Sequence, residues 1–228
     1  MPLVAYKDLC VDVGDLRVGL GFWGPTLGLD VVPDEHDPGE FHLEGPTPRH
    51  TVWPCPVPEP KTVKNRVHLD VHAGSPEVAG ATRLSAPREF PWTVMAGPEG
   101  DELCVFEREV VPRYRLHEIV VDCVDHARTS SWWHGLWGGR REVDERGFSW
   151  IDRVPGVPFD GFAFVPVPEP KAAKNRVHWD VTLEPGVAPS DLQAAGATIL
   201  REPDGEISWT VMADPEGNEF CVFPEGTP

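Results

Sequence analysis

The sequence has little positive charge and no long apolar run, and each shortage excludes a class of partner. Lysine and arginine total 20 against 37 aspartates and glutamates, so the formal charge is −17. A surface of that sign repels phosphate groups, which argues against nucleic acid and anionic membranes. No stretch is apolar for long enough to cross a bilayer, and residues 1–15 carry acids where a signal peptide needs an apolar segment. We therefore expect a cytoplasmic protein with neither a nucleic-acid nor a membrane partner.

Several catalytic motifs are also missing. There is no glycine-rich phosphate loop, no GxSxG elbow and no Ser–His–Asp order, so nothing supports a nucleotide-dependent enzyme or a hydrolase. The five cysteines include no CxxC pair, and an odd number cannot all pair, so we expect reduced thiols. No residue is assigned a catalytic role.

What the chain does contain is a long internal repeat. VPEPKTVKNRVHLDV at 57–71 returns as VPEPKAAKNRVHWDV at 167–181, and WTVMAGPEGDELCVF at 92–106 returns as WTVMADPEGNEFCVF at 209–223. The offset grows from 167 − 57 = 110 to 209 − 92 = 117, so the first copy is seven residues shorter between the blocks. The pattern predicts a tandem duplication with its junction near 107–113.

Within each copy the order is a strand, a short helix and further strands, read twice. In the second copy, β-rich runs predict strands at 116–123, 177–183, 198–201, 208–213 and 219–223. A helix is expected over 125–134, and Ser190 is expected to cap the start of another. Strand alternation places Trp179 on the face opposite His178 and Asp180.

The N-terminal copy is expected to have shorter helices. Pro25 stands where the second copy has Gly135, and a proline inside a helix removes a hydrogen bond and clashes with the preceding turn. Most of the seven residues that the first copy lacks are missing from segment 75–82, which aligns with the longer segment 188–198 of the second copy. We therefore expect the first helix to end early and the second to be reduced.

The two long blocks, in a βαβββ order used twice per copy, resemble the vicinal oxygen chelate superfamily and, within it, the glyoxalase/bleomycin-resistance group. The resemblance covers nearly the whole chain. It implies an α+β fold of two tandem domains, 1–108 and 113–228, each built from two βαβββ modules whose sheet forms an open cup. It also implies a ligand inside the cup. Some members hold a divalent metal there and act as lyases, isomerases or dioxygenases, and others bind a drug without chemistry.

The resemblance suggests a metal site in the second domain. His117 and His178 match the family's two histidine positions, while its carboxylate position holds Cys221, two residues after Glu219. One implied set is His117, His178 and Glu219, which suits non-heme iron, and Mn or Ni are further candidates. In the other set Cys221 replaces Glu219, which suits zinc. The alternative is that His178 and Asp180 hydrogen-bond within the sheet and that no metal or other cofactor is bound.

A standard glyoxalase I reaction is disfavoured, because it needs two carboxylates and the strand around 162–164 offers none. The first domain is expected to be metal-free, since Lys7 stands where the second copy has His117 and would place an ammonium beside His68. The second domain is therefore expected to carry the function.

The function expected first is binding of a small, partly aromatic molecule by the second domain, with a metal-dependent enzyme as the alternative. The expected ligand-binding residues are His178, Asp180, Arg176 and Trp209. For Arg176 an ion pair with a nearby carboxylate is the competing interpretation. A third possibility is a structural or partner-binding unit whose cups are filled by side chains. The chain is expected to be a monomer, with its two domains in place of the dimer that single-domain relatives form.

Overall fold

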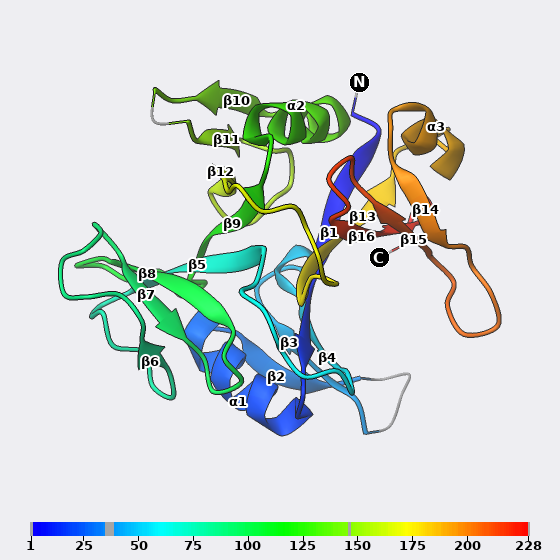
Figure 1. Cartoon of the computed structure of the whole chain (residues 1–228). Coiled ribbons are helices and arrows are strands. Elements are labelled where there is room, and N and C mark those ends of the chain that lie inside the picture. Colours follow the sequence, from blue (N-terminus) through cyan, green and yellow to red (C-terminus); the bar gives the residue numbers. More distant parts are fainter. Residues whose placement is uncertain (1, 35–38, 146, 228) are drawn as a thin grey trace.

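The computed structural model describes residues 2–34, 39–145 and 147–227, and these residues form sixteen strands and three α-helices (Figure 1). Four modules follow one another along the chain. The first contains β1 (Val4–Val13), α1 (Leu16–Leu27), β2 (Asp30–Pro33), β3 (Phe41–Glu44), the short 3-10 helix η1 (Pro48–His50) and β4 (Val52–Pro56). The second contains β5 (Val67–Ala73), β6 (Thr82–Arg83), β7 (Thr93–Ala96) and β8 (Glu102–Glu107). The third contains β9 (Leu116–Cys123), α2 (His126–Trp137), β10 (Arg140–Val143), β11 (Ser149–Asp152) and β12 (Gly161–Pro166). The fourth contains β13 (Val177–Leu183), α3 (Pro189–Ala194), β14 (Thr198–Arg201), β15 (Thr210–Ala213) and β16 (Glu219–Phe223).

The modules combine into two open sheets of eight strands each. The first sheet has the order β14-β15-β16-β13-β1-β4-β3-β2, and the second has the order β10-β11-β12-β9-β5-β8-β7-β6. The antiparallel pair β1–β13 joins the halves of the first sheet, and the antiparallel pair β5–β9 joins the halves of the second (Figure 1). The α+β class and the open sheets predicted from the sequence are confirmed. Each sheet, however, takes one module from each copy, so the first module pairs with the fourth and the second with the third.

Two extended connectors direct this exchange of modules. Residues 57–66 lead from β4 in the first sheet to β5 in the second, and residues 167–176 lead from β12 back to β13. Their prolines fix φ and keep the backbone extended, so a module does not fold back on the one before it. Lys61 Nζ donates to Glu102 Oε1 at 2.8 Å, and Lys171 Nζ donates to Glu219 Oε1 at 2.6 Å, which fastens each connector to the module that follows it.

Helix α1 contradicts the expectation that Pro25 shortens it. The helices α1 and α2 both have 12 residues. Pro25 lies exposed in the last turn of α1, so only one intrahelical bond is lost, and the residue four positions earlier is Gly21. Gly28 ends the helix at φ 71°, a conformation that glycine adopts easily, and its N–H donates to the Gly24 carbonyl.

The second and fourth modules differ where the deletion falls. The fourth has α3, which begins at Pro189 rather than after Ser190, so the predicted cap is wrong. The carboxylate of Asp191 instead accepts a hydrogen bond from the backbone N–H of Ala188 at 2.8 Å. In the second module, the described residues 74–81 form turns between β5 and β6 and no helix.

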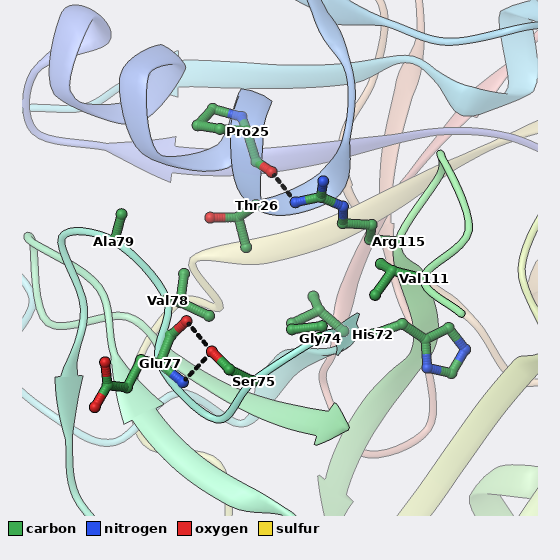
Figure 2. A pocket seen from close by; sticks show the side chains of 12 residues that line it. Pro25, Thr26, His72, Gly74, Ser75, Glu77, Val78, Ala79, Val111 and Arg115 are labelled. Atoms are coloured by element: carbon green, nitrogen blue, oxygen red, sulfur yellow. Dashed lines mark hydrogen bonds between the residues drawn. The ribbon is translucent and has the colours of Figure 1, made fainter. Parts of the chain in front are cut away.

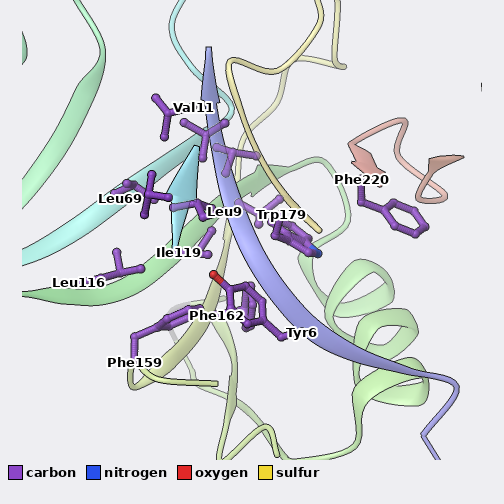
Figure 3. Close-up of a cluster of buried hydrophobic side chains, with 14 of the residues drawn as sticks. Tyr6, Leu9, Val11, Leu69, Leu116, Ile119, Phe159, Phe162, Trp179 and Phe220 are labelled. Atoms are coloured by element: carbon purple, nitrogen blue, oxygen red, sulfur yellow. The ribbon is translucent and has the colours of Figure 1, made fainter. Parts of the chain in front are cut away.

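The core lies where the apolar faces of the two sheets meet. Leu9 and Trp179 of the first sheet and Leu69 and Phe162 of the second belong to one buried cluster (Figure 3). Helix α2 adds Trp133 and Trp137, whose rings contact aromatic side chains of the strands. The centroid distances are 4.9 Å for Trp133–Trp179, 4.3 Å for Trp137–Phe162 and 4.9 Å for Trp133–Phe220. All three tryptophans are buried, and Trp179 lies on the face predicted from strand alternation. None of the helices in the described ranges is both long and apolar enough to cross a membrane.

Candidate functional site

The repeated blocks build the same group of three polar side chains in each sheet. Burying Trp179 leaves His178 and Asp180 on the opposite face of β13, and parallel pairing with β16 brings Cys221 beside them. His178 Nε2 lies 3.6 Å from Cys221 Sγ and 3.7 Å from Asp180 Oδ1. We call this group the first triplet, and the sheet face that carries it the polar face of the first sheet.

The second sheet holds a matching group, the second triplet. His68 Nε2 lies 3.6 Å from Cys104 Sγ and 3.5 Å from Asp70 Oδ1. Burial lowers the pKa of His68 to about 3 and that of His178 to about 4, so both imidazoles are neutral at pH 7. The near-identity of the two blocks therefore gives each sheet the same neutral histidine beside an acid and a thiol.

Bulges in β1 and β9 add two consecutive side chains to each polar face. The register of β1 against β13 shifts between Tyr6 and Leu9, so the bulge contains Lys7 and Asp8. In a regular strand two neighbouring side chains point to opposite faces, whereas the extra residue of a bulge lets both point to the same face. Lys7 Nζ accordingly donates to Asp8 Oδ2 at 2.7 Å.

The first module supplies the surroundings of the first triplet. Cys10 Sγ donates to Asp180 Oδ2 at 3.7 Å, and Trp53 Nε1 donates to Asp8 Oδ2 at 3.1 Å. Burial, with the nearby Asp8, raises the pKa of Asp180 well above its usual value. A hydrogen bond with Cys55, together with burial, raises the pKa of the Cys10 thiol. The group is therefore a buried set of uncharged donors and acceptors next to the Lys7–Asp8 ion pair.

Aromatic rings adjoin this set. Trp209 stacks on Phe223 with 5.2 Å between ring centroids, and Lys7 Nζ lies 4.8 Å from the Phe223 centroid. Trp53 packs against His42 at 4.5 Å. Trp53, Trp209 and Phe223 are all partly exposed. The polar face of the first sheet thus combines buried polar atoms with accessible flat rings.

The second triplet has different neighbours. Val120 and Val165 stand where the first sheet has Cys10 and Cys55, in the same registers. Asp70 faces Glu118 on β9, and burial with the charge of Glu118 raises the pKa of Asp70. Burial, with Asp160 and Asp152, raises the pKa of Glu118 to about 7.

A further group lies on the second sheet. His117 Nδ1 and Asp160 Oδ2 are 2.8 Å apart, and the ring of His117 stacks on that of His72 at 4.4 Å. We call these three residues the outer cluster. Burial lowers the pKa of both histidines.

The predicted metal set is not assembled. His117 lies on β9 in the second sheet and His178 on β13 in the first, because each sheet combines modules from both copies. Glu219 accepts from Lys171 Nζ at 2.6 Å and from the backbone N–H of Asn175 at 3.2 Å, so its carboxylate fastens a connector. Cys221, the alternative ligand, does lie beside His178.

Lys7 is also placed differently from the expectation. It faces the first triplet, which contains His178, and not His68. The expected placement of the Lys7 ammonium beside His68 is therefore wrong. The physical cause is again the pairing of β1 with β13.

The expected ligand-binding residues divide into two groups. His178 and Asp180 lie on the polar face of the first sheet, with the Trp209 ring on Phe223 of β16. Arg176 lies in a connector, where it donates to the carbonyls of Glu59 and Asp12 at 3.0 Å each, and its Nε is 3.5 Å from Asp101 Oδ1. Sequence reasoning missed Asp8, Cys10 and Cys55, because a bulge and a sheet partner are not visible in local patterns.

Two hollows lie outside these faces. A groove of about 620 Å³ runs between the two connectors and contains both of their KNR segments. A pocket of about 360 Å³ lies between the end of α1 and the turn that replaces a helix in the second module (Figure 2). The imidazole of His72 points away from Pro25 and Ala79 in this pocket (Figure 2).

Comparison with known proteins gives matches over most of the chain. The family model described as a glyoxalase-like domain matches residues 8–106 and again residues 118–223. Among solved structures, the V278E mutant of glyoxalase I from Zea mays superimposes with a TM-score of 0.69 at 14% identity, covering 96% of this chain and 92% of that one. A putative dioxygenase from Bacillus subtilis superimposes with a TM-score of 0.62 at 14% identity, covering 99% and 86%. No curated protein sequence matches. At these identities the structural likeness concerns the fold alone.

Proposed function

The chain belongs to the glyoxalase-like domain family of the vicinal oxygen chelate superfamily as a tandem pair, and from this premise we propose that it binds a small, partly aromatic molecule on the polar face of the first sheet. The observation that carries the proposal is a set of buried polar atoms without partners. Asp8 Oδ1, Asp180 Oδ1 and His178 Nδ1 are buried and make no hydrogen bond with any residue that the structure describes. Each such atom costs about 1–3 kcal/mol, which a hydroxyl or amide of a ligand recovers.

The rings beside these atoms support an aromatic ligand. Trp53 donates its indole N–H to Asp8 Oδ2, so the Asp8 carboxyl group lies at the edge of a partly exposed ring. Trp209 and Phe223 form a second flat surface. Lys7 lies over the Phe223 ring and pairs with Asp8, so this surface is also next to the Asp8 carboxyl group. Flat rings next to a few convergent polar atoms are typical of small-molecule sites.

Paired tryptophan variants test the proposal. We would titrate the full chain with 2-naphthol, a neutral hydroxylated aromatic, and with bleomycin, following tryptophan fluorescence with and without chelator. Trp209→Ala is expected to weaken binding about tenfold, since one ring stack contributes about 0.5–1.5 kcal/mol beyond burial. Trp92→Ala is the matched control, because Trp92 stacks on Phe106 at the same position of the second sheet.

Asp180→Asn provides a second test. It keeps the shape of the side chain and changes its hydrogen-bonding groups, so binding should weaken while the fold persists by circular dichroism. No saturable binding of either probe, or an equal loss in Trp92→Ala and Trp209→Ala, would refute the proposed site. Binding that disappears with chelator would favour the alternative below.

A metal-dependent enzyme is the second candidate, and the first triplet together with Cys10 favours it. Around zinc, with Zn–S of about 2.3 Å and Zn–N of about 2.0 Å, tetrahedral S and N donors lie about 3.5 Å apart. The 3.6 Å between Cys221 and His178 and the 3.7 Å between Cys10 and Asp180 are close to that spacing. The residues therefore fit a soft divalent metal, which would act as a Lewis acid when bound. Lys7 would balance the extra negative charge of the ionised donors.

Elemental analysis of chain purified without chelator tests this candidate. We expect bound zinc to fall in His178→Ala and to persist in Glu219→Gln, because Glu219 belongs to a connector. Metal content near zero, unchanged in His178→Ala, would exclude it.

A further inference from the structure

The outer cluster brings together side chains from three separate segments of the second sheet. His72 lies near the end of β5, His117 lies at the bulge of β9, and Asp160 directly precedes β12. One potential ligand atom from each residue falls within 4.8 Å of the other two. The set consists of two imidazoles and one carboxylate.

The geometry of the cluster is held by packing. The two imidazole rings stack with 4.4 Å between centroids and 29° between planes, and the edge of Phe106 meets His117 at 5.0 Å. His117 Nδ1 and Asp160 Oδ2 lie 2.8 Å apart, so these two potential ligand atoms already face each other. His72 Nδ1 is buried and has no hydrogen-bond partner within the described ranges of the chain.

We propose that His72, His117 and Asp160 bind a first-row divalent transition metal at the outer edge of the second sheet. Two histidines and one carboxylate on one side of an ion are the donor set that suits iron(II) and its neighbours, and they leave positions open for water or a small ligand. The site lies in the other sheet from the small-molecule face proposed above and does not depend on it.

The distances allow an ion after a small movement. With metal–ligand bonds of about 2.1 Å, neighbouring donors lie about 3.0–3.4 Å apart. His117 Nδ1 and Asp160 Oδ2, now 2.8 Å apart, must separate slightly, and the ligand atoms of all three residues lie within 4.8 Å of one another. The side chain of Asp160 is 68% exposed, so it can turn without disturbing the core.

The cluster is a feature of one sheet and not of the duplicated scaffold. The positions that correspond to His72, His117 and Asp160 in the first sheet hold Thr182, Lys7 and His50. Its thiol-free composition also separates it from the second triplet, which is buried and includes Cys104.

The local charge has both signs. Glu118 follows His117 along β9, and it joins Asp160 as an acid that attracts a cation. Arg108 opposes them, because its charge acts on both His72 and His117. Since Arg108 is exposed, it can be removed without loss of packing.

Cobalt(II) titration of the full, metal-stripped and reduced chain tests the proposal, with calorimetry for affinity and visible absorption for ligand type. We expect d–d bands without a thiolate-to-cobalt charge-transfer band from this site. His72→Ala, His117→Ala and Asp160→Asn should each weaken that binding at least about tenfold. His126→Ala, which removes a histidine that hydrogen-bonds Ser149, should leave it unchanged.

Further variants separate this site from the triplets. The component without charge transfer should survive in His68→Ala and His178→Ala, and Arg108→Ala should strengthen it severalfold. Circular dichroism checks that each variant is folded. If a histidine variant unfolds, Asp160→Asn still tests the site, because the Asp160 side chain is exposed. The proposal is overturned if no Co²⁺ binds, if all binding shows thiolate charge transfer, or if Asp160→Asn and His72→Ala both bind as the parent does.

Discussion

At the scale of single residues, the polar faces hold carboxyl groups that burial keeps protonated. Glu118 has a pKa raised to about 7, first by burial and then by Asp160 and Asp152. In the unfolded chain the same group titrates near 4.5. Between these values the folded state binds more protons than the unfolded state, so the free energy of unfolding falls as pH rises through this window and stays lower above it.

Glu118→Gln should therefore be more stable than the parent at high pH. The expected gain is about 1–3 kcal/mol at pH 8, decreasing toward zero at pH 4, because glutamine has no charge to bury. Urea unfolding measured across this pH range checks the prediction. Glu109→Gln, at an exposed position, is the control and should show no such trend. An identical pH slope in Glu118→Gln and the parent would contradict it.

Residue-level reasoning predicted part of the site. Strand alternation correctly put His178 and Asp180 on one face and Trp179 in the core, because one periodicity decides both. The positions of Lys7 and Asp8 could not be predicted, since the bulge that turns both inward depends on pairing with a strand far along the chain. Glu219 was predicted as a metal ligand, but its carboxylate binds Lys171. This contact could not be predicted, because it depends on the path of the connector.

At the scale of elements, the two copies fix their first helices differently. In the second copy Trp133 Nε1 on α2 donates to Asp214 Oδ2 at 3.1 Å. In the first copy the position of Asp214 is taken by Gly97, and a Cβ there would lie 2.7 Å from Phe22 Cε1 on α1. The first copy thus uses a small residue to admit a ring where the second uses a hydrogen bond.

Two glycine variants should therefore have opposite effects. Gly97→Ala is expected to destabilise the protein by about 1–3 kcal/mol through crowding against Phe22. Gly135→Ala is expected to stabilise it by about 0.5–1 kcal/mol, because Gly135 is an exposed position inside α2 with open space around its Cβ. Thermal and urea unfolding measure both. A loss of stability in Gly135→Ala, or none in Gly97→Ala, would contradict the packing described.

The connector ion pairs give a third prediction. The side chains of Lys171 and Glu219 are only 12% and 14% exposed, so Glu219→Ala leaves a mostly buried ammonium without a partner. We expect a loss of about 3 kcal/mol in unfolding free energy, largely recovered in the double variant Lys171→Met, Glu219→Leu. Co²⁺ binding should be unaffected in the double variant. Loss of metal with unchanged stability would instead restore Glu219 as a ligand.

At the scale of the whole molecule, the two copies are not independent units. Strand β1 of the first copy pairs with β13 of the second, and β5 pairs with β9. The sequence predicted the duplication and the fold class but not this choice of partners. Strands β5 and β13 read VHLDVHA and VHWDVTL, so local pattern cannot decide which of them β1 joins.

Separating the copies tests this pairing. The fragments 1–110 and 111–228, each alone, should fail to form a stable folded monomer, because each lacks half of both sheets and exposes the unpaired edges of its central strands. Expressed together, they should form a one-to-one complex with the circular dichroism of the intact chain, which we expect to sediment as a monomer. A folded, monomeric 1–110 fragment would show that each copy closes on itself.

The order in which paired strands appear along the chain also determines when each sheet can form during synthesis. The second sheet is built from residues 67–166, but β1 needs β13, which ends at Leu183. At about 5–20 residues per second, roughly 5–20 s pass between the completion of β5 and that of β13. During that time β5 has been synthesised and β13 has not, and the sequence of β5 closely resembles that of β13, the strand with which β1 pairs in the folded protein. The newly made chain must therefore either keep β1 unpaired until β13 emerges or release it from β5.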